Sequence, residues 1–133
     1  MLLVKTYLAS SKIHGIGLFA GQNIKKGKKT WGYTAGFDSA LNPQKVKRMP
    51  QSLRDFIYTY ASLSMTSHKY ILGNDNVRFT NHSTSPNLEA VKIKGEVEKI
   101  ARAKRDIKKG EELTIDYRTF DKEDATGDKG YLN

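Results

Sequence analysis

Apolar residues along the chain fall into short runs separated by turn-forming residues, a pattern typical of proteins built mainly from β-strands. Two such runs, 88–93 and 96–103, flank Lys94-Gly95 and predict a hairpin that turns there. Four further runs have strand character: 2–8, 30–33, 70–72 and 113–117. The pattern therefore favours a mainly β protein.

In the last of these runs, Leu113, Ile115 and Tyr117 alternate with Thr114 and Asp116. Successive side chains of a strand point to opposite faces, so we expect the first three to share one face and the other two to share the opposite face. Periodicity by itself makes Tyr117 an ordinary half-buried aromatic residue.

One segment has helical periodicity instead. Its apolar positions recur with the spacing of a single helix face, at Leu53, Phe56, Ile57 and Tyr60. Ser52 followed by Asp55 is typical of a capping box at a helix start. Residues 42–48 favour a shorter helical turn before it, interrupted at Pro50. We expect a helical insert over about residues 42–63.

The sequence contains an internal repeat. Residues 20–29 match residues 103–112 at a constant offset, with Ala, then Asn or Asp, then Ile before a Lys-Lys-Gly turn. A strand-like run follows each turn. Two unrelated turns would not explain the matching Ala and Ile positions, so the repeat predicts two similar β corners related by pseudo-symmetry.

A glycine-rich segment precedes the first copy. Residues 15–20 formally match the Gly-x-Gly-x-x-Gly/Ala fingerprint of dinucleotide-binding folds, but that fingerprint requires a following helix, and residues 21–29 have no helical periodicity. What remains is local. Gly15 and Gly17 could let the backbone approach a ligand closely or could form a tight turn, and the two residues favour neither reading.

Composition narrows the chemistry. At 133 residues the chain fits one domain, and it has no cysteine, which excludes disulfides, thiolate zinc clusters and cysteine nucleophiles. Three histidines without His-Glu-x-x-His spacing make a metal site a poor expectation. The apolar run 1–4 is too short for a signal peptide or membrane span, so we expect a soluble intracellular protein, cytoplasmic or nuclear.

Charge is unevenly distributed. The net charge is +9, but residues 111–133 hold seven acids and three bases, a charge of −4, which leaves +13 on the remainder. The basic part could attract nucleic acid or an acidic partner, and the acidic end could receive a basic peptide. Both could equally be solvated surface.

The least generic stretch is residues 77–87, a polar segment dense in side chains that hydrogen-bond to nearby backbone and favour turns. Together with two other segments it resembles the SET domain of protein-lysine methyltransferases. The matching motifs are His14-Gly15-Ile16-Gly17-Leu18-Phe19-Ala20, Arg78-Phe79-Thr80-Asn81-His82-Ser83 through Pro86-Asn87, and Gly110-Glu111-Glu112-Leu113-Thr114-Ile115-Asp116-Tyr117.

This resemblance implies a β-clip or SET fold: several small β-sheets, a C-terminal pseudoknot and one inserted helical segment, in a single domain over 1–133. The pseudoknot is an exception to the usual un-threaded topology of proteins. Members with cysteine-rich flanking modules use them to complete the substrate channel. Because this chain lacks such modules, the tail of about 118–133 is expected to complete it.

The resemblance also implies roles for individual residues. The cofactor would be S-adenosylmethionine, held by Ile16, Gly17, Leu18, Arg78, Phe79, Asn81 and His82. Tyr117 would be the catalytic residue, acting by orientation and electrostatic stabilisation rather than proton abstraction. The residues expected to line the substrate channel are Tyr33, Ile115, Phe120 and Tyr131.

The expected function is methyl transfer to a lysine of a basic protein, such as a histone tail, with weak nucleic-acid contact through the basic body and pairing into a homodimer as further expectations. Two alternatives stay open: a non-catalytic β-clip binding module, because a fold does not prove a function, and a basic nucleic-acid-associated protein. The modified lysine and the number of methyl groups added are not determined by the sequence.

Overall fold

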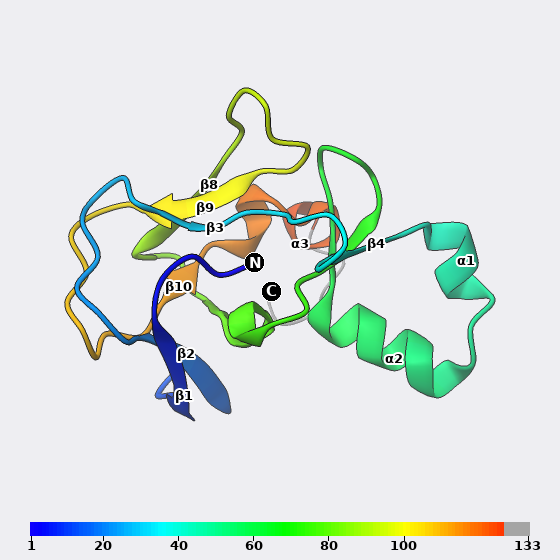
Figure 1. Ribbon diagram of the computed structural model, residues 1–133. Coiled ribbons are helices and arrows are strands. Elements are labelled where there is room, and N and C mark those ends of the chain that lie inside the picture. The colour runs from blue at the N-terminus through cyan, green and yellow to red at the C-terminus, as the bar shows by residue number, and fades with distance from the viewer. Residues whose placement is uncertain (127–133) are drawn as a thin grey trace.

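A computed structural model of the chain describes residues 1–126, so the prediction for Tyr131 lies outside the described residues. Small sheets surround a central region, and two helices extend from one end (Figure 1). The prediction of a mainly β protein with several small sheets and a helical insert is confirmed. Among the described helices, none is long and apolar enough to cross a membrane.

The strands form four separate sheets. The first is an antiparallel pair, β1 (Thr6–Ser10) and β2 (Ile16–Ala20). Two sheets have three strands each, ordered β3-β9-β8 and β4-β6-β5. Their bounds are β3 (Lys29–Trp31), β9 (Ile100–Ala103), β8 (Leu88–Val91), β4 (Ser39–Leu41), β6 (Tyr70–Leu72) and β5 (Ser62–Leu63). The fourth sheet is a parallel pair, β7 (Asn81–His82) and β10 (Thr114–Ile115).

Helical turns occupy the insert and the two segments around the central loop. The insert contains α1 (Pro43–Lys47) and α2 (Gln51–Tyr60), and the described chain ends in α3 (Lys122–Thr126). Short 3₁₀ turns, η1 (Asn76–Phe79) and η2 (Tyr117–Thr119), precede β7 and follow β10. The helical insert is therefore present where the periodicity predicts it, and the dinucleotide fingerprint is excluded because β2, not a helix, follows the glycines.

The predicted start of the helix is wrong, and its apolar face is only partly covered. Helix α2 begins at Gln51 with Pro50 at the N-cap and no side-chain cap, so Ser52 lies inside the first turn and forms no capping box. Leu53 and Phe56 are 46% and 38% exposed, whereas Ile57 is buried. The helix contacts β6 and α1 along a narrow stripe centred on Ile57, which leaves part of its apolar face uncovered.

The predicted face alternation of the last strand agrees with the packing: Leu113 and Ile115 belong to one hydrophobic core and Tyr117 packs against it, whereas Thr114 lies beside Asn87. The strand is only two residues long, and Leu113, Thr114 and Ile115 are all buried, because the segment is enclosed on both faces. Tyr117 does not continue the strand but begins η2. Thr114 has a buried polar neighbour instead of solvent, since its Oγ1 lies 3.4 Å from the backbone nitrogen of Asn87.

The two copies of the repeat pair with each other. Ile24 and Ile107 exchange both backbone hydrogen bonds, each at 2.8 Å. Asn23 Oδ1 accepts from the Lys109 N–H at 2.9 Å, and Asp106 Oδ1 accepts from the Lys26 N–H at 2.8 Å. Each copy thus caps the turn of the other, which confirms the predicted pseudo-symmetric corners.

The main hydrophobic core lies directly behind these corners and under the central loop. Its buried members come from both copies and from the strands beside them: Leu18, Ala20, Ile24, Leu88, Ala103, Ile107, Leu113 and Ile115. A second, smaller cluster holds the helical insert: Val46, Ile57, Ala61, Tyr70 and Leu72. The loop that carries the polar motif is therefore supported by the larger core.

Candidate active site

The parallel pair β7 and β10 joins the polar motif to the C-terminal strand. Asn81 pairs with Thr114 and His82 with Ile115, and the Ser83 N–H donates to the Ile115 carbonyl at 3.1 Å. Parallel neighbours cannot be connected by a tight hairpin, so the chain must travel a long way between them. This is the pairing that the expected pseudoknot requires.

Asn87 secures this junction from below. Its side chain is buried, and its amide donates to the Glu112 carbonyl at 2.8 Å while its Oδ1 accepts from the Thr114 N–H at 2.9 Å. One amide side chain therefore satisfies a backbone acceptor and a backbone donor of the C-terminal segment at once, which explains why the polar motif ends in Asn.

Asn81 connects the motif to the glycine segment. Its amide donates to Glu112 Oε2 at 2.9 Å and to the carbonyl oxygens of His14 at 3.0 Å and Ile16 at 3.4 Å. The Glu112 carboxylate also accepts from Ser11 Oγ at 2.8 Å. The three sequence motifs thus meet in one hydrogen-bonded network centred on Asn81 and Glu112.

The two glycines have different roles. Gly15 has φ of +48°, a conformation that favours glycine, and it forms the tight turn between β1 and β2. Gly17 is needed for close approach: a Cβ there would lie 2.5 Å from Glu112 Oε2. The group that approaches Gly17 is therefore the Glu112 side chain.

Tyr117 is fixed at both ends. Its N–H donates to His82 Nδ1 at 3.0 Å, and its hydroxyl donates to the Thr80 carbonyl. Its ring packs against His82 and Phe120, with centroid distances of 5.3 and 5.8 Å. Burial, and then the negative charges of Asp124 and Asp121, raise the pKa of the Tyr117 hydroxyl, so the phenol is neutral at pH 7.

His82 accepts the hydrogen bond from the Tyr117 N–H with its imidazole in the neutral form. Burial lowers the pKa of His82, and the Asp116 carboxylate 3.8 Å away opposes this shift without cancelling it. A neutral imidazole can accept a hydrogen bond at Nδ1, which the contact with the Tyr117 N–H requires. Asp116 is itself ionised, because the Arg118 guanidinium that hydrogen-bonds to it lowers the pKa of the Asp116 carboxyl.

Arg78 lies in an aromatic environment. Its guanidinium carbon is 5.5–5.8 Å from the ring centroids of Phe56, Tyr60 and Phe79. Its Nε is buried, and within residues 1–126 this atom has no hydrogen-bond partner. Cation–π contacts stabilise the charge but leave N–H groups able to bind an anion.

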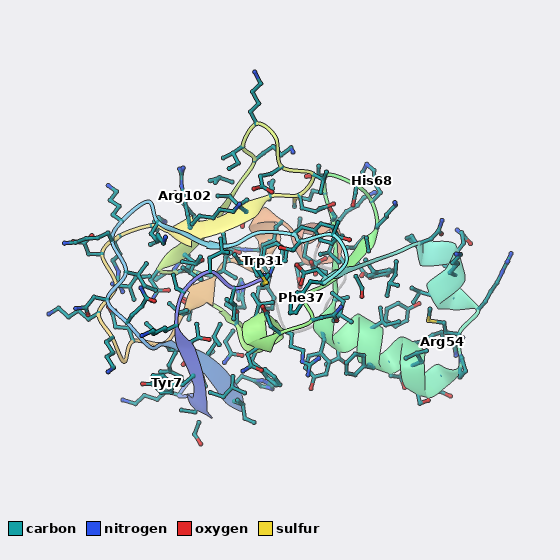
Figure 2. The ribbon with its side chains drawn as sticks, in the orientation of Figure 1. Tyr7, Trp31, Phe37, Arg54, His68 and Arg102 are labelled. Carbon is teal, nitrogen blue, oxygen red and sulfur yellow. The ribbon has the colours of Figure 1, made fainter. Side chains whose placement is uncertain are left out.

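These segments surround a cavity of about 1260 Å³. Most of the predicted site residues line it: Ile16, Leu18, Arg78, Phe79, Asn81, His82, Ile115, Tyr117 and Phe120. Trp31, which lies near the middle of the molecule in Figure 2, lines it as well. The structure thus brings together residues from the glycine segment, the polar motif and the C-terminal segment.

Two predicted residues do not line this cavity. Gly17 is buried behind it against Glu112, so its contribution is to the packing of the site. Tyr33 lies in the loop after β3, where its hydroxyl donates to the Asp38 carbonyl at 3.4 Å. A channel role for Tyr33 stays a prediction without support from this geometry.

Sequence reasoning missed several residues that organise the site. In the sequence, Glu112 is only one member of a motif, and nothing distinguishes it from the adjacent Glu111. In the structure, Glu111 forms a surface ion pair with Arg105 at 2.9 Å. Glu98 is buried, lines the cavity and accepts from Ser64 Oγ. Nothing in the local sequence distinguishes Glu98 from the charged residues of an ordinary hairpin.

Comparison with known proteins places this geometry in a family. Residues 15–118 match the family model described as SET domain. That range contains the three motifs except for His14, both copies of the repeat and the cavity-lining residues from Ile16 to Tyr117.

Curated relatives have the same region inside much longer proteins. The chain is 31% identical over 94% of its length to a histone-lysine N-methyltransferase, H3 lysine-4 specific, of Aspergillus oryzae, and 34% identical over 90% to the histone-lysine N-methyltransferase trr of Drosophila melanogaster. It spans only 11% and 5% of those two proteins.

A solved structure has the same fold. The Neurospora SET domain protein DIM-5, a histone lysine methyltransferase, superposes with a TM-score of 0.61 at 22% identity, over 87% of this chain and 53% of that one. The predicted fold class is thereby confirmed.

Proposed function

The chain belongs to the SET-domain family, and on that premise we propose that it transfers a methyl group from S-adenosylmethionine to a lysine side chain of a basic protein, such as a histone tail. The observation that carries the proposal is the position of Tyr117. Tyr117 lines the cavity, its hydroxyl donates to the Thr80 carbonyl, and it follows the strand that pairs with the polar motif.

The residues present suit the cofactor. S-adenosylmethionine combines an adenine ring, a positive sulfonium and an amino-acid end with a carboxylate. Exposed apolar side chains at Ile13 and Ile16, 51% and 53% exposed, would contact the adenine, and the Arg78 guanidinium with its buried, unbonded Nε would bind the carboxylate. Asn81 and His82 would position the remaining polar groups. When bound, the sulfonium supplies the activated methyl group.

The substrate lysine must lose a proton before it can accept a methyl group. A lysine amine with the ordinary pKa of 10.4 is neutral at pH 7 in only about one molecule in 10³ to 10⁴. Deprotonating it at this pH therefore costs roughly 4.6 kcal/mol of free energy. Burial among Ile115, Phe120 and the Tyr117 ring would lower the lysine pKa by removing water, and a nearby positive charge would lower it further.

Tyr117 would orient the amine without acting as its base. A phenol with a raised pKa has no tendency to ionise at pH 7, and deprotonation to the phenolate is therefore unfavourable. A hydroxyl that donates to the Thr80 carbonyl can still accept a hydrogen bond from the lysine amine. Holding the amine in line with the methyl group contributes on the order of 7 to 11 kcal/mol in favourable cases.

In this proposal, Phe120 and Asp121 at the start of the tail lie at the end of the cavity where the substrate lysine enters. Phe120 packs on Tyr117, and Asp121 is buried and accepts from the Leu63 N–H at 3.3 Å. The tail would complete the channel. A histone substrate would also locate the protein at chromatin. Pairing into a homodimer stays a prediction.

The direct test is label transfer. The purified chain is incubated with methyl-labelled S-adenosylmethionine and core histones, and labelled residues are identified by mass spectrometry. We expect methyl-lysine on a histone tail. The control is a peptide with the sequence of the labelled histone tail in which every lysine is replaced by arginine, and it should remain unlabelled. The same incubation is repeated with proteins of a cell lysate. If neither the histones nor the lysate proteins are labelled, the proposal is contradicted.

The non-catalytic binding module is separated by a second measurement. Ligand binding to the native state raises stability by about 2.7 kcal/mol when the ligand is present at 100 times its Kd. A thermal-shift titration with S-adenosylmethionine should therefore raise the melting temperature. A binding module that kept only the fold would show no shift.

A further inference from the structure

The repeat places four lysines side by side at one end of the molecule. Lys25 and Lys26 belong to the first turn and Lys108 and Lys109 to the second, and we call these four residues the lysine platform. The reciprocal hydrogen bonds between Ile24 and Ile107 bring the turns together. In Figure 1 the two loops run next to each other on the side of the molecule opposite α1 and α2.

The platform is exposed and strongly positive. All four lysines are exposed, and within residues 1–126 none of their ammonium groups forms an ion pair. Segments 22–28 and 104–111 together contain seven basic and two acidic residues, a net charge of +5. Both acids are engaged: Asp106 accepts from the Lys26 backbone, and Glu111 pairs with Arg105.

The backbone beneath the lysines is well fixed. Asn23 and Asp106 cap the opposite turns at 2.9 and 2.8 Å, and the Gly27 and Gly110 N–H groups donate across the repeat at 2.8 Å. The turns flank a hollow of about 480 Å³ that Lys25, Lys108 and Lys109 help to line. Flexible ammonium groups are therefore presented from a rigid base.

We infer that the lysine platform binds the phosphate backbone of duplex DNA without sequence specificity. Lysine is a point charge on a flexible stem, which suits phosphates at regular spacing and carries no base readout. Segments 22–28 and 104–111 contain no aromatic residue, and their two isoleucines are buried, so the surface lacks the apolar anchors typical of a protein interface. Charge without apolar contact favours nucleic acid over an acidic protein.

The platform is separate from the proposed active site. None of its lysines lines the cavity, and the core residues Ile24 and Ile107 lie between the turns and the cavity strands. DNA binding would leave the cavity open to a protein segment. The inference does not rest on methyl transfer, because binding is measured without cofactor or protein substrate.

The test compares two variants with the same loss of charge. The platform variant carries Lys25→Gln, Lys26→Gln, Lys108→Gln and Lys109→Gln, and the control carries Lys45→Gln, Lys47→Gln, Lys69→Gln and Lys94→Gln, all at exposed positions away from the platform. Fluorescence anisotropy of a labelled DNA duplex gives the affinity as a function of salt concentration. Circular dichroism of both variants checks that they are folded.

Four phosphate contacts predict that the log–log salt slope of the wild type is steeper than that of the platform variant by about 3.6. Between 50 and 200 mM salt this corresponds to a difference of about a hundredfold in the loss of affinity. The control variant should keep the wild-type slope. An unchanged slope in the platform variant, an equal loss in the control, or binding of polyglutamate as tight as that of DNA would overturn the inference, the last in favour of an acidic protein partner.

Discussion

The two copies of the repeat begin alike and lead to different places. Each has the same Lys-Lys-Gly turn and the same hydrogen bonds to its counterpart. After the first turn, β3 joins an antiparallel sheet beside β9 and contributes Trp31 to the cavity lining. After the second, β10 pairs in parallel with β7, and the chain continues into Tyr117, which also lines the cavity. Local sequence determines the corner, whereas the partner strand determines which part of the site the following residues form.

The largest expected effect comes from Asn87, whose side chain binds the segment that leads from the second copy to Tyr117. Asn87→Ala should destabilise the protein by about 3 kcal/mol, because it leaves the buried Thr114 N–H and Glu112 carbonyl without partners. Urea unfolding followed by circular dichroism measures this loss. The control is Asn74→Ala, which removes hydrogen bonds of an exposed asparagine near β4. A small loss in Asn87→Ala, similar to the control, would mean that the junction holds without this amide.

Glu112 and Glu111 are neighbours on the second copy with different surroundings. Glu112→Ala should weaken S-adenosylmethionine binding by about tenfold, because Asn81 and Ser11 lose a charged acceptor worth about 1.5 kcal/mol or more. Glu111→Ala removes an exposed pair with Arg105 and should change binding little. Isothermal titration of both variants measures the contrast. Equal affinities would show that Glu112 does not position the cofactor side of the site.

The pseudo-symmetric caps offer a more balanced comparison. Asn23→Ala and Asp106→Ala should each lower the free energy of unfolding by about 1 kcal/mol, since each removes one acceptor for a turn N–H of the other copy. Chemical denaturation should give similar losses for the two variants. A loss confined to one of them would show that the corners are energetically unequal despite their shared geometry.

The smallest effect concerns the pH dependence of His82. Its folded-state pKa lies below the unfolded value of about 6.5, so the unfolded chain binds more protons between these two values. This contribution to stability is complete above about pH 6.5 and is lost as the pH falls toward the folded pKa. Urea midpoints between about pH 7 and pH 5 should fall more steeply in the wild type than in His82→Gln. Identical slopes would contradict the assignment.

Much of the fold follows from the sequence because its signals are local. The hairpin 88–103, strand β6, the first helical turn after Asn42 and the repeat corners are encoded by turn residues and short-range patterning. The capping-box prediction failed because the helix already starts after Pro50, whose position at the N-cap is two residues before Ser52. Periodicity indicates an apolar face on α2, but it cannot show how much partner surface is available to cover that face.

The site was less predictable, because its contacts join residues far apart in the chain. The Asn81 amide donates to Glu112, and the same carboxylate leaves no room for a side chain at position 17. No pattern within one segment reveals such a contact. Most of the residues that the motif resemblance indicated do line the cavity, but the resemblance could not show that the Tyr33 hydroxyl contacts Asp38, or that Glu98 is buried beside Ser64.

The central claim is that Tyr117, in the segment that follows the second copy of the repeat, orients the reacting lysine. The decisive measurement is the methyl-transfer rate of Tyr117→Phe beside its affinity for S-adenosylmethionine, with Tyr7→Phe, at an exposed strand position, as the control. We predict a rate about 10²-fold or more below wild type, unchanged cofactor affinity, and a control at the wild-type rate. A Tyr117→Phe variant that transfers methyl groups at the wild-type rate would contradict the account.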